Sequence, residues 1–171
     1  MNTKKMLVLP ACLLLIFFGC RKSSSAGALP PNTFIADVNG VTETFSARII
    51  ATRIDNNTTN PGNPPYSISL VGYSVDSFYS DDMQILINNT TPILPGTYKY
   101  RASADFNSAI FLVFTQNPSD FDYTPGDNGL AAITITSINS TNVQGTFSGN
   151  LLGTNNRSRT ITNGRFNLNF K

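Results

Sequence analysis

The residues best suited to chemistry lie in one acidic segment, 120–129, with the sequence DFDYTPGDNG. Asp120, Asp122 and Asp127 place three carboxylates close together, and the Asn128 amide follows at once. Oxygen donors of this kind bind Ca²⁺, which takes about six to eight of them. The spacing differs from an EF-hand, because the third carboxylate comes late and no glutamate closes the loop. The segment therefore predicts either a weak metal site or a solvated loop whose Pro-Gly and Asn-Gly pairs form turns.

The chain contains no histidine, which limits the enzyme classes that it can belong to. Ser–His and Cys–His nucleophilic pairs, His-ligated zinc and imidazole acid–base catalysis are all excluded. Asp120 and Asp122 would lie in an exposed loop, where nothing would separate their pKa values for acid–base work. We therefore expect a protein that is not an enzyme and carries no cofactor. The alternative is a carboxylate- or metal-dependent hydrolase that uses Asp120, Asp122 and Asp127.

Three further groups of residues are candidates for contact with a ligand. They are the pair Asp81-Asp82, the arginines Arg157, Arg159 and Arg165, and the aromatic residues Tyr73, Phe78 and Tyr79. The arginines can bind a carboxylate or a sugar acid, and the aromatic rings can stack on a sugar. Each group also has a simpler interpretation, as a charged loop, a solvated hairpin end, or rings that cap the core.

The first twenty residues indicate where the protein works. Lys4 and Lys5 precede an apolar run of thirteen residues, 6–18, and Gly19 then precedes Cys20. As a helix this run would rise only about 20 Å, against a hydrocarbon core of about 30 Å. The layout resembles the signal peptide of a bacterial lipoprotein, in which the cysteine is acylated and becomes the first mature residue. We expect a signal peptide over 1–19 and lipidation at Cys20, with plain secretion as the alternative.

Composition narrows the classes of partner. Without Lys4 and Lys5 the chain has ten basic and ten acidic residues, and charged residues make up 13% of the sequence. No basic block is available to follow a phosphate backbone, so we expect no nucleic-acid binding. Cys12 would leave with the signal peptide, so the mature domain would contain no disulfide. Its surface would owe its polarity to Asn, Thr and Ser.

The rest of the chain predicts a flexible tether over 20–31 and one domain over 32–171. Strand signals recur at short intervals and no helix is convincing, which is typical of an antiparallel β-sandwich or β-barrel, here of about eight to ten strands. Asn39-Gly40 predicts a type I′ hairpin turn, with a return strand over 41–54. Residues 110–114 (IFLVF) are apolar on both faces and predict a central strand covered on both sides. Apolar residues change phase between Ile161 and Phe166, which predicts a β-bulge near Asn163-Gly164.

Five short motifs extend over nearly the whole mature chain. They are FIADVNGV at 34–41, PGTY at 95–98, ITIT at 133–136, GTFS at 145–148 and TITNGRF at 160–166. In this order they resemble a family of uncharacterised lipoproteins from Bacteroidota, a domain of unknown function. The resemblance implies an envelope lipoprotein with a β-fold and implies no catalytic or binding residue. It also implies that Arg21-Lys22, after the cysteine, favour the periplasmic side of a membrane.

These observations predict a lipid-anchored binding or structural module of the bacterial cell envelope. The expected ligand is a glycan, a peptide or a small apolar molecule, and the expected membrane partner is reached through the N-terminal lipid. A surface adhesion or assembly subunit is a further alternative. The sequence leaves the oligomeric state open.

Overall fold

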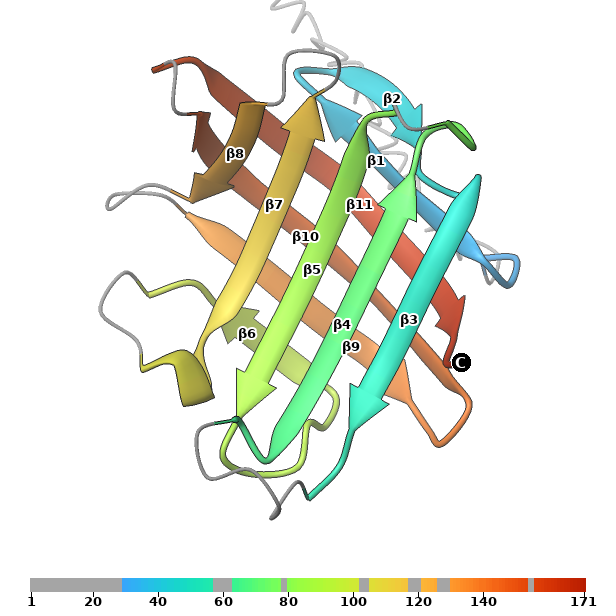
Figure 1. The fold of residues 1–171 in the computed structure, drawn as a ribbon, viewed down its shortest axis with the longest axis vertical. Coiled ribbons are helices and arrows are strands. Elements are labelled where there is room, and N and C mark those ends of the chain that lie inside the picture. The colour runs from blue at the N-terminus through green and yellow to red at the C-terminus, as the bar shows by residue number, and fades with distance from the viewer. Residues whose placement is uncertain are drawn as a thin grey trace, which may run out of the picture.

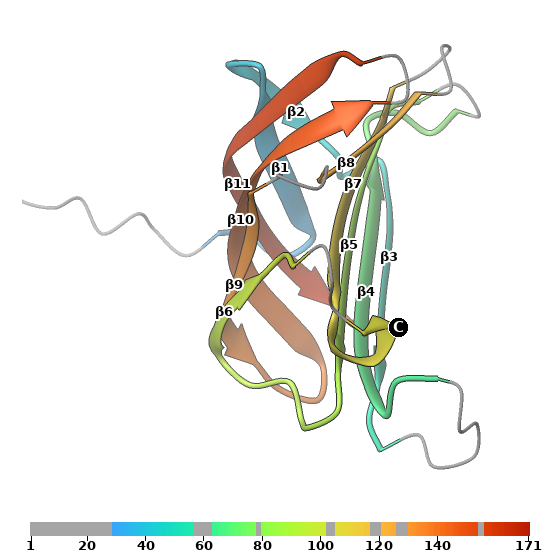
Figure 2. The same ribbon diagram turned by 90° about the vertical axis from the view of Figure 1, so that its left-hand side faces the viewer.

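Two antiparallel sheets pack against each other in the computed structural model (Figures 1 and 2). The structure describes residues 29–56, 63–77, 80–101, 105–116, 121–125, 130–153 and 156–171. In these residues the elements are β1 (Thr33–Val38), β2 (Val41–Thr44), β3 (Arg48–Ile54), β4 (Tyr66–Tyr73), β5 (Asp82–Asn89), β6 (Gly96–Lys99), a 3-10 turn η1 (Phe106–Ser108), β7 (Ile110–Gln116), β8 (Phe121–Pro125), β9 (Ala131–Ile138), β10 (Asn142–Gly153) and β11 (Ser158–Asn169). The predicted all-β class is confirmed, and the fold is a sandwich rather than a closed barrel.

The two sheets differ in how they are assembled. We call β2, β1, β11, β10, β9 and β6 sheet I, and β3, β4, β5 and β7 sheet II. At one edge β8 connects them, because it pairs both with the end of β10 and with β7. At the other edge the end of the chain meets β3, where the Lys171 amide donates to the Ala51 carbonyl at 3.0 Å. Figure 2 shows the two layers with β8 between them.

Both local irregularities predicted in sheet I are confirmed. Asn39 and Gly40 have φ values of 50° and 82°, as a type I′ turn requires. In β11 the pairing with both neighbours shifts by one residue between Ile161 and Gly164. Asn163 takes a φ of 51° at this bulge. The extra residue brings Ile161 and Phe166 onto the same buried face.

The return strand predicted over 41–54 is wrong in one respect, because the chain changes sheets within it. The Phe45 amide donates to Phe34 in sheet I at 2.7 Å, whereas the Ala47 amide donates to Tyr73 in sheet II at 3.1 Å. The backbone turns a corner between these two residues, and Ala47 leaves the buried face there although the alternation resumes in the same phase. A single strand over 41–54 would place Phe45, Ala47 and Ala51 on one face, but only Phe45 and Ala51 are buried and Ala47 is exposed.

Strand β7 lies inside sheet II, between β5 and β8, yet it is not covered on both sides. Its inward residues Ile110, Leu112 and Phe114 are buried. Phe111, on the outer side, is half-buried and contacts only Phe106 of η1 among the ring pairs of the described residues, at 6.0 Å between ring centroids. Apolar residues on both faces thus indicated a central strand correctly and an outer cover wrongly.

The core is built from phenylalanine rings that lie over glycines. Phe34 contacts Phe147 and Phe45 with centroid distances of 5.6 and 6.0 Å. A Cβ at Gly145 would collide with the Phe166 ring, and one at Gly72 would collide with the Phe34 ring. Sheets I and II therefore use the same device on their inner faces: a glycine makes room for a ring, which comes from the neighbouring strand β11 at Gly145 and from β1 of the opposite sheet at Gly72.

Within the described part of the chain, no helix has the length and apolar character needed to span a membrane.

Candidate binding site on the outer face of sheet I

Half of the acidic segment 120–129 is a β-strand. Residues 121–125 form β8, so the expectation of a solvated loop is wrong for them, and Asp122 stands opposite Thr115 of β7. Asp120 and Asp127 lie outside the described residues, as does Cys20, and the side chain of Asp122 is not described. Among described residues no group of three or more acidic, histidine or cysteine side chains is placed to hold a metal. The metal site and the lipidation site stay predictions.

The three arginines do not form a common basic cluster. Arg159 precedes the bulge in β11 and faces the inside of the sandwich, where its Nη2 donates to Gln116 Oε1 at 2.5 Å. Arg165 follows the bulge and is exposed on the outer face. The inserted residue reverses the phase of the strand, so the two guanidinium groups end on opposite faces of sheet I. Arg157 is exposed ahead of the strand.

The other two predicted groups have separate structural settings. Asp82 begins β5 and is buried, and its Oδ1 accepts a hydrogen bond from Gln84 at 2.9 Å. The Tyr73 ring lies on the outer face of sheet II with the Arg48 guanidinium 4.0 Å from its centre, a cation–π contact. Phe78 and Tyr79 lie outside the described residues. None of these residues lines the hollow described next.

A hollow of about 620 Å³ lies on the outer face of sheet I, across β9, β10, β11, β1 and β2. This volume falls within the ~300–1,000 Å³ range of small-molecule sites. Outward alternation along each strand brings polar side chains into it. They are Asp37, Thr42, Thr134, Thr146, Ser148, Asn163 and Arg165.

The bulge in β11 positions the central group of this hollow. Because of the extra residue, Thr162 and Asn163 both lie on the exposed side. Asn163 Nδ2 donates to Asp37 Oδ2 on β1 at 2.7 Å, and Thr42 Oγ1 on β2 donates to Asp37 Oδ1 at 2.6 Å. Three strands thus converge on one carboxylate. The β1–β2 hairpin provides two of these residues and the bulge provides the third.

Hydrogen bonding keeps the central carboxylate ionised. The hydrogen bonds from Thr42 and then Asn163 lower the pKa of Asp37; burial opposes them, and the positive charge of Arg165, the weakest of these effects, lowers the pKa as well. Each donor stabilises the charged form of the acid, which is why the pKa falls. Asp37 is therefore a fixed acceptor of hydrogen bonds at neutral pH.

A row of hydroxyl groups leads away from this carboxylate. Thr134 of β9 pairs with Thr146 of β10 on one side and with Thr97 of β6 on the other. The hydroxyl oxygens of Thr97 and Thr134 lie 2.9 Å apart. Thr146 in turn pairs with Arg165. Neighbouring strands are about 4.8 Å apart, so the row presents hydrogen-bonding groups at regular intervals across the sheet.

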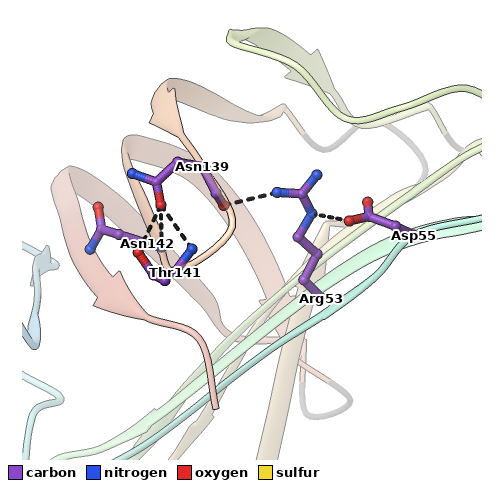
Figure 3. Close-up of polar contacts among 5 residues, drawn as sticks. All are labelled: Arg53, Asp55, Asn139, Thr141 and Asn142. Atoms are coloured by element: carbon purple, nitrogen blue, oxygen red, sulfur yellow. Dashed lines mark hydrogen bonds and ion pairs between the residues drawn. The ribbon is translucent and has the colours of Figure 1, made fainter.

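A second polar region joins the two sheets at the opposite end from β8. Arg53 of β3 donates from Nη1 to the Asn139 carbonyl at 2.9 Å and forms an ion pair with Asp55 at 2.8 Å (Figure 3). The Asn139 side chain accepts from the backbone amides of Thr141 and Asn142, both at 2.8 Å. These groups satisfy one another and hold the β9–β10 turn against β3, which assigns them a structural role.

Glu43 lies on the inner side of β2, at the end of the sandwich away from Arg53 and Asn139. Burial raises the pKa of Glu43, the carboxylate of Asp81 raises it further, and Arg159 opposes the effect. The pKa of Glu43 therefore shifts in the opposite direction to that of Asp37 on the neighbouring strand: burial and a like charge raise it, whereas hydrogen-bond donors lower the pKa of Asp37.

The chain matches no family model, no curated protein and no solved structure. The candidate site therefore rests on geometry alone.

Proposed function

We propose that this protein is a lipid-anchored binding module of the bacterial cell envelope, and that its ligand occupies the hollow of sheet I. One observation carries the proposal: three strands hold an ionised Asp37 in a hollow whose other polar groups are hydroxyls, the Asn163 amide and Arg165. Fixed directional groups in a concave surface are the usual basis of selective ligand binding. Cys20 and the segment before it support the anchor.

The proposed anchor is compatible with the place where the described chain begins. Asn167 of β11 donates to the Leu29 carbonyl at 2.5 Å, so the chain enters on the outer side of sheet I. The nine steps from Cys20 to Leu29 can span at most about 30 Å. The hollow would then be held close to the membrane that carries the lipid. The resemblance to Bacteroidota lipoproteins and the periplasmic location belong to the same proposal.

The proposed lipid anchor is tested by replacing the sulfur atom of Cys20 with oxygen. Cys20→Ser should move the protein from the membrane fraction to the soluble fraction of the cells that produce it, because a serine cannot accept the thioether-linked lipid. Far-UV circular dichroism of the released protein should show an unchanged β-fold. A serine variant that still sediments with membranes would show that another segment anchors the chain.

The binding site is tested on chemically separated envelope fractions: polysaccharide, peptidoglycan and lipid. Each is immobilised and offered the Cys20→Ser protein, an Arg165→Gln variant of the hollow, and a Thr52→Val control on the outer face of sheet II. At least one fraction should retain the parent and the control but retain much less of the Arg165→Gln variant. Equal retention of all three proteins on every fraction would rule out the hollow as the binding site.

A further inference from the structure

The charges around the hollow indicate what kind of ligand fits it. Asp37 and Arg165 are the charged residues among those that line it, and they have opposite signs. Arg165 acts on the Asp37 carboxylate closely enough to lower its pKa. The hollow therefore has no net charge, and a ligand with a full charge would have to leave one of these two groups uncompensated. A neutral ligand meets no such penalty.

The hydrogen-bonding capacity left in the hollow fits hydroxyl groups. A carboxylate offers about four lone-pair positions, and Thr42 and Asn163 use one on each oxygen of Asp37. The Asn163 amide has a second N–H and a carbonyl oxygen beyond the bond it gives to Asp37. Acceptor and donor thus stand side by side: two neighbouring hydroxyl groups can both donate to Asp37, and one of them can also accept from the remaining Asn163 N–H.

A peptide strand is a poorer fit at this position. Peptides that add to a sheet bind along an edge strand, where backbone N–H and C=O groups are unpaired. The hollow instead lies on the face of the sheet, where β9, β10, β11 and β1 are each paired on both sides, and of the residues that line it only Thr42 belongs to the edge strand β2. On these paired strands the groups left for a ligand are side chains: Asp37, Arg165, several hydroxyls and the Asn163 amide, beside the apolar Ile35 and Ala132.

We infer that the ligand of this hollow is a neutral saccharide, and that Asp37 and Asn163 together contact two adjacent hydroxyl groups of one sugar ring, while Thr146 and Ser148 contact the next. This inference rests on the proposed function, because it names the ligand class of the same site. Ile35 and Ala132 offer aliphatic contact to the C–H groups of the ring. No aromatic side chain projects outwards there among the described residues that line the hollow, so the binding is weak and depends on the hydrogen bonds.

The test uses the Cys20→Ser full-length protein and defined probes: neutral oligosaccharides of glucose, mannose, galactose and xylose, and oligomers of galacturonic acid. Calorimetry measures affinity, and NMR shifts of the backbone amides locate the site. At least one neutral oligosaccharide should bind and shift the amides of Asp37, Ser148 and Asn163. Tighter binding of the galacturonic acid oligomers would overturn the inference.

Three variants separate recognition from folding. Asp37→Asn should weaken binding about tenfold or more, because hydrogen bonds to a charged group are the strong ones. Thr146→Val keeps the shape of an exposed side chain and should weaken binding by about threefold to tenfold. Thr52→Val, on the other sheet, should bind as the parent does. Unchanged affinity in both Asp37→Asn and Thr146→Val would overturn the inference even when a sugar binds elsewhere.

The outcomes also distinguish this inference from the proposed function. If an envelope fraction still depends on Arg165 while no neutral oligosaccharide binds, the hollow is a binding site for another ligand and only the saccharide inference fails. If neither the fractions nor the oligosaccharides depend on any residue of the hollow, both fail.

Discussion

The outer faces of the two sheets obey the same alternation and carry opposite chemistry. On sheet I the outward residues are mostly hydroxyls and amides, and they bond to one another, as Asp37, Thr42 and Asn163 do. On sheet II the outward residues include Val71, Val113, Leu86 and Phe111, which lie in two neighbouring cross-strand rows. Alternation specifies which side chains build the core, while the outward positions stay free to build a site.

The two outer faces also differ in the size of the hollow that each carries. The hollow of sheet I measures about 620 Å³, and the apolar groove beside Phe106 on sheet II about 340 Å³. Apolar side chains on a surface are ordinary in soluble proteins and need no partner. Directional groups held at fixed positions are a stronger indication of selectivity, which is why the saccharide proposal concerns sheet I.

The largest expected loss of stability tests whether the glycines on the inner faces of the two sheets are equally intolerant of a side chain. Gly145→Ala in sheet I and Gly72→Ala in sheet II should each lower the free energy of unfolding by about 2–4 kcal/mol, because the new methyl group collides with a phenylalanine ring and a backbone carbonyl. Urea unfolding measures both. Gly40→Ala is the control. Apart from those of its two chain neighbours, the heavy atoms of other residues lie more than 4 Å from the methyl group added there, so the substitution costs only the strain of the positive φ, about 1 kcal/mol. A Gly72→Ala variant as stable as this control would show that the inner faces differ.

An intermediate effect should separate the outer faces. Phe106 is 52% exposed and packs against Phe111. Phe106→Ala should lower the free energy of unfolding by about 1 kcal/mol, the usual value of an aromatic pair. Thr146→Val on sheet I should change it by less than about 0.5 kcal/mol. The same urea experiment compares them, and a larger loss from Thr146→Val would mean that the hydroxyl row stabilises the fold.

The smallest effect concerns the dependence of stability on pH, because the pKa values of Asp37 and Glu43 are shifted in opposite directions. The pKa of Asp37 is lowered in the folded state, so its stabilising contribution is present above its unfolded pKa and lost as the pH falls through the folded pKa. The pKa of Glu43 is raised, so its contribution is present below its unfolded pKa and lost as the pH rises through the folded pKa. Urea midpoints measured from about pH 3 to pH 8 should therefore pass through a maximum.

Two substitutions show which carboxylate is responsible for the loss of stability on each side of that maximum. Asp37→Asn should flatten the acidic side, and Glu43→Gln should flatten the other side and raise the midpoint slightly at neutral pH. If Glu43→Gln instead lowers the urea midpoint at neutral pH, the ionised carboxylate stabilises the folded protein through its attraction to Arg159.

Local patterns predicted the local features of this fold and little of what depends on distant segments. Asn39-Gly40 and the phase change before Phe166 each have a short-range cause, and both were predicted at the right place. The change of sheet after Phe45 was missed because alternation looks continuous through it. Strand β8 was missed because Pro125 and the acidic residues around it are typical of a loop.

The candidate site could not be predicted for the same reason. Asp37 and Asn163 are 126 residues apart in the chain, and nothing in either segment indicates that they meet. The sequence did contain both halves of the site, the hairpin that carries Asp37 and the bulge that carries Asn163. It was the pairing of β1 with β11 that joined them. Carboxylate spacing along the chain favoured Asp120, Asp122 and Asp127 instead, which are closer in sequence.

The insertion of β11 between β1 and β10 also makes the start of the domain depend on its end (Figure 1). Until residues 158–169 are available, the β1–β2 hairpin has no neighbouring strand in sheet I, and a two-stranded hairpin alone is barely stable in water. Contacts between such distant segments form slowly, on a scale of about milliseconds to seconds. The hollow therefore requires the pairing of β1 with β11, and a ligand that binds there recognises only chains in which the two ends of the domain have come together.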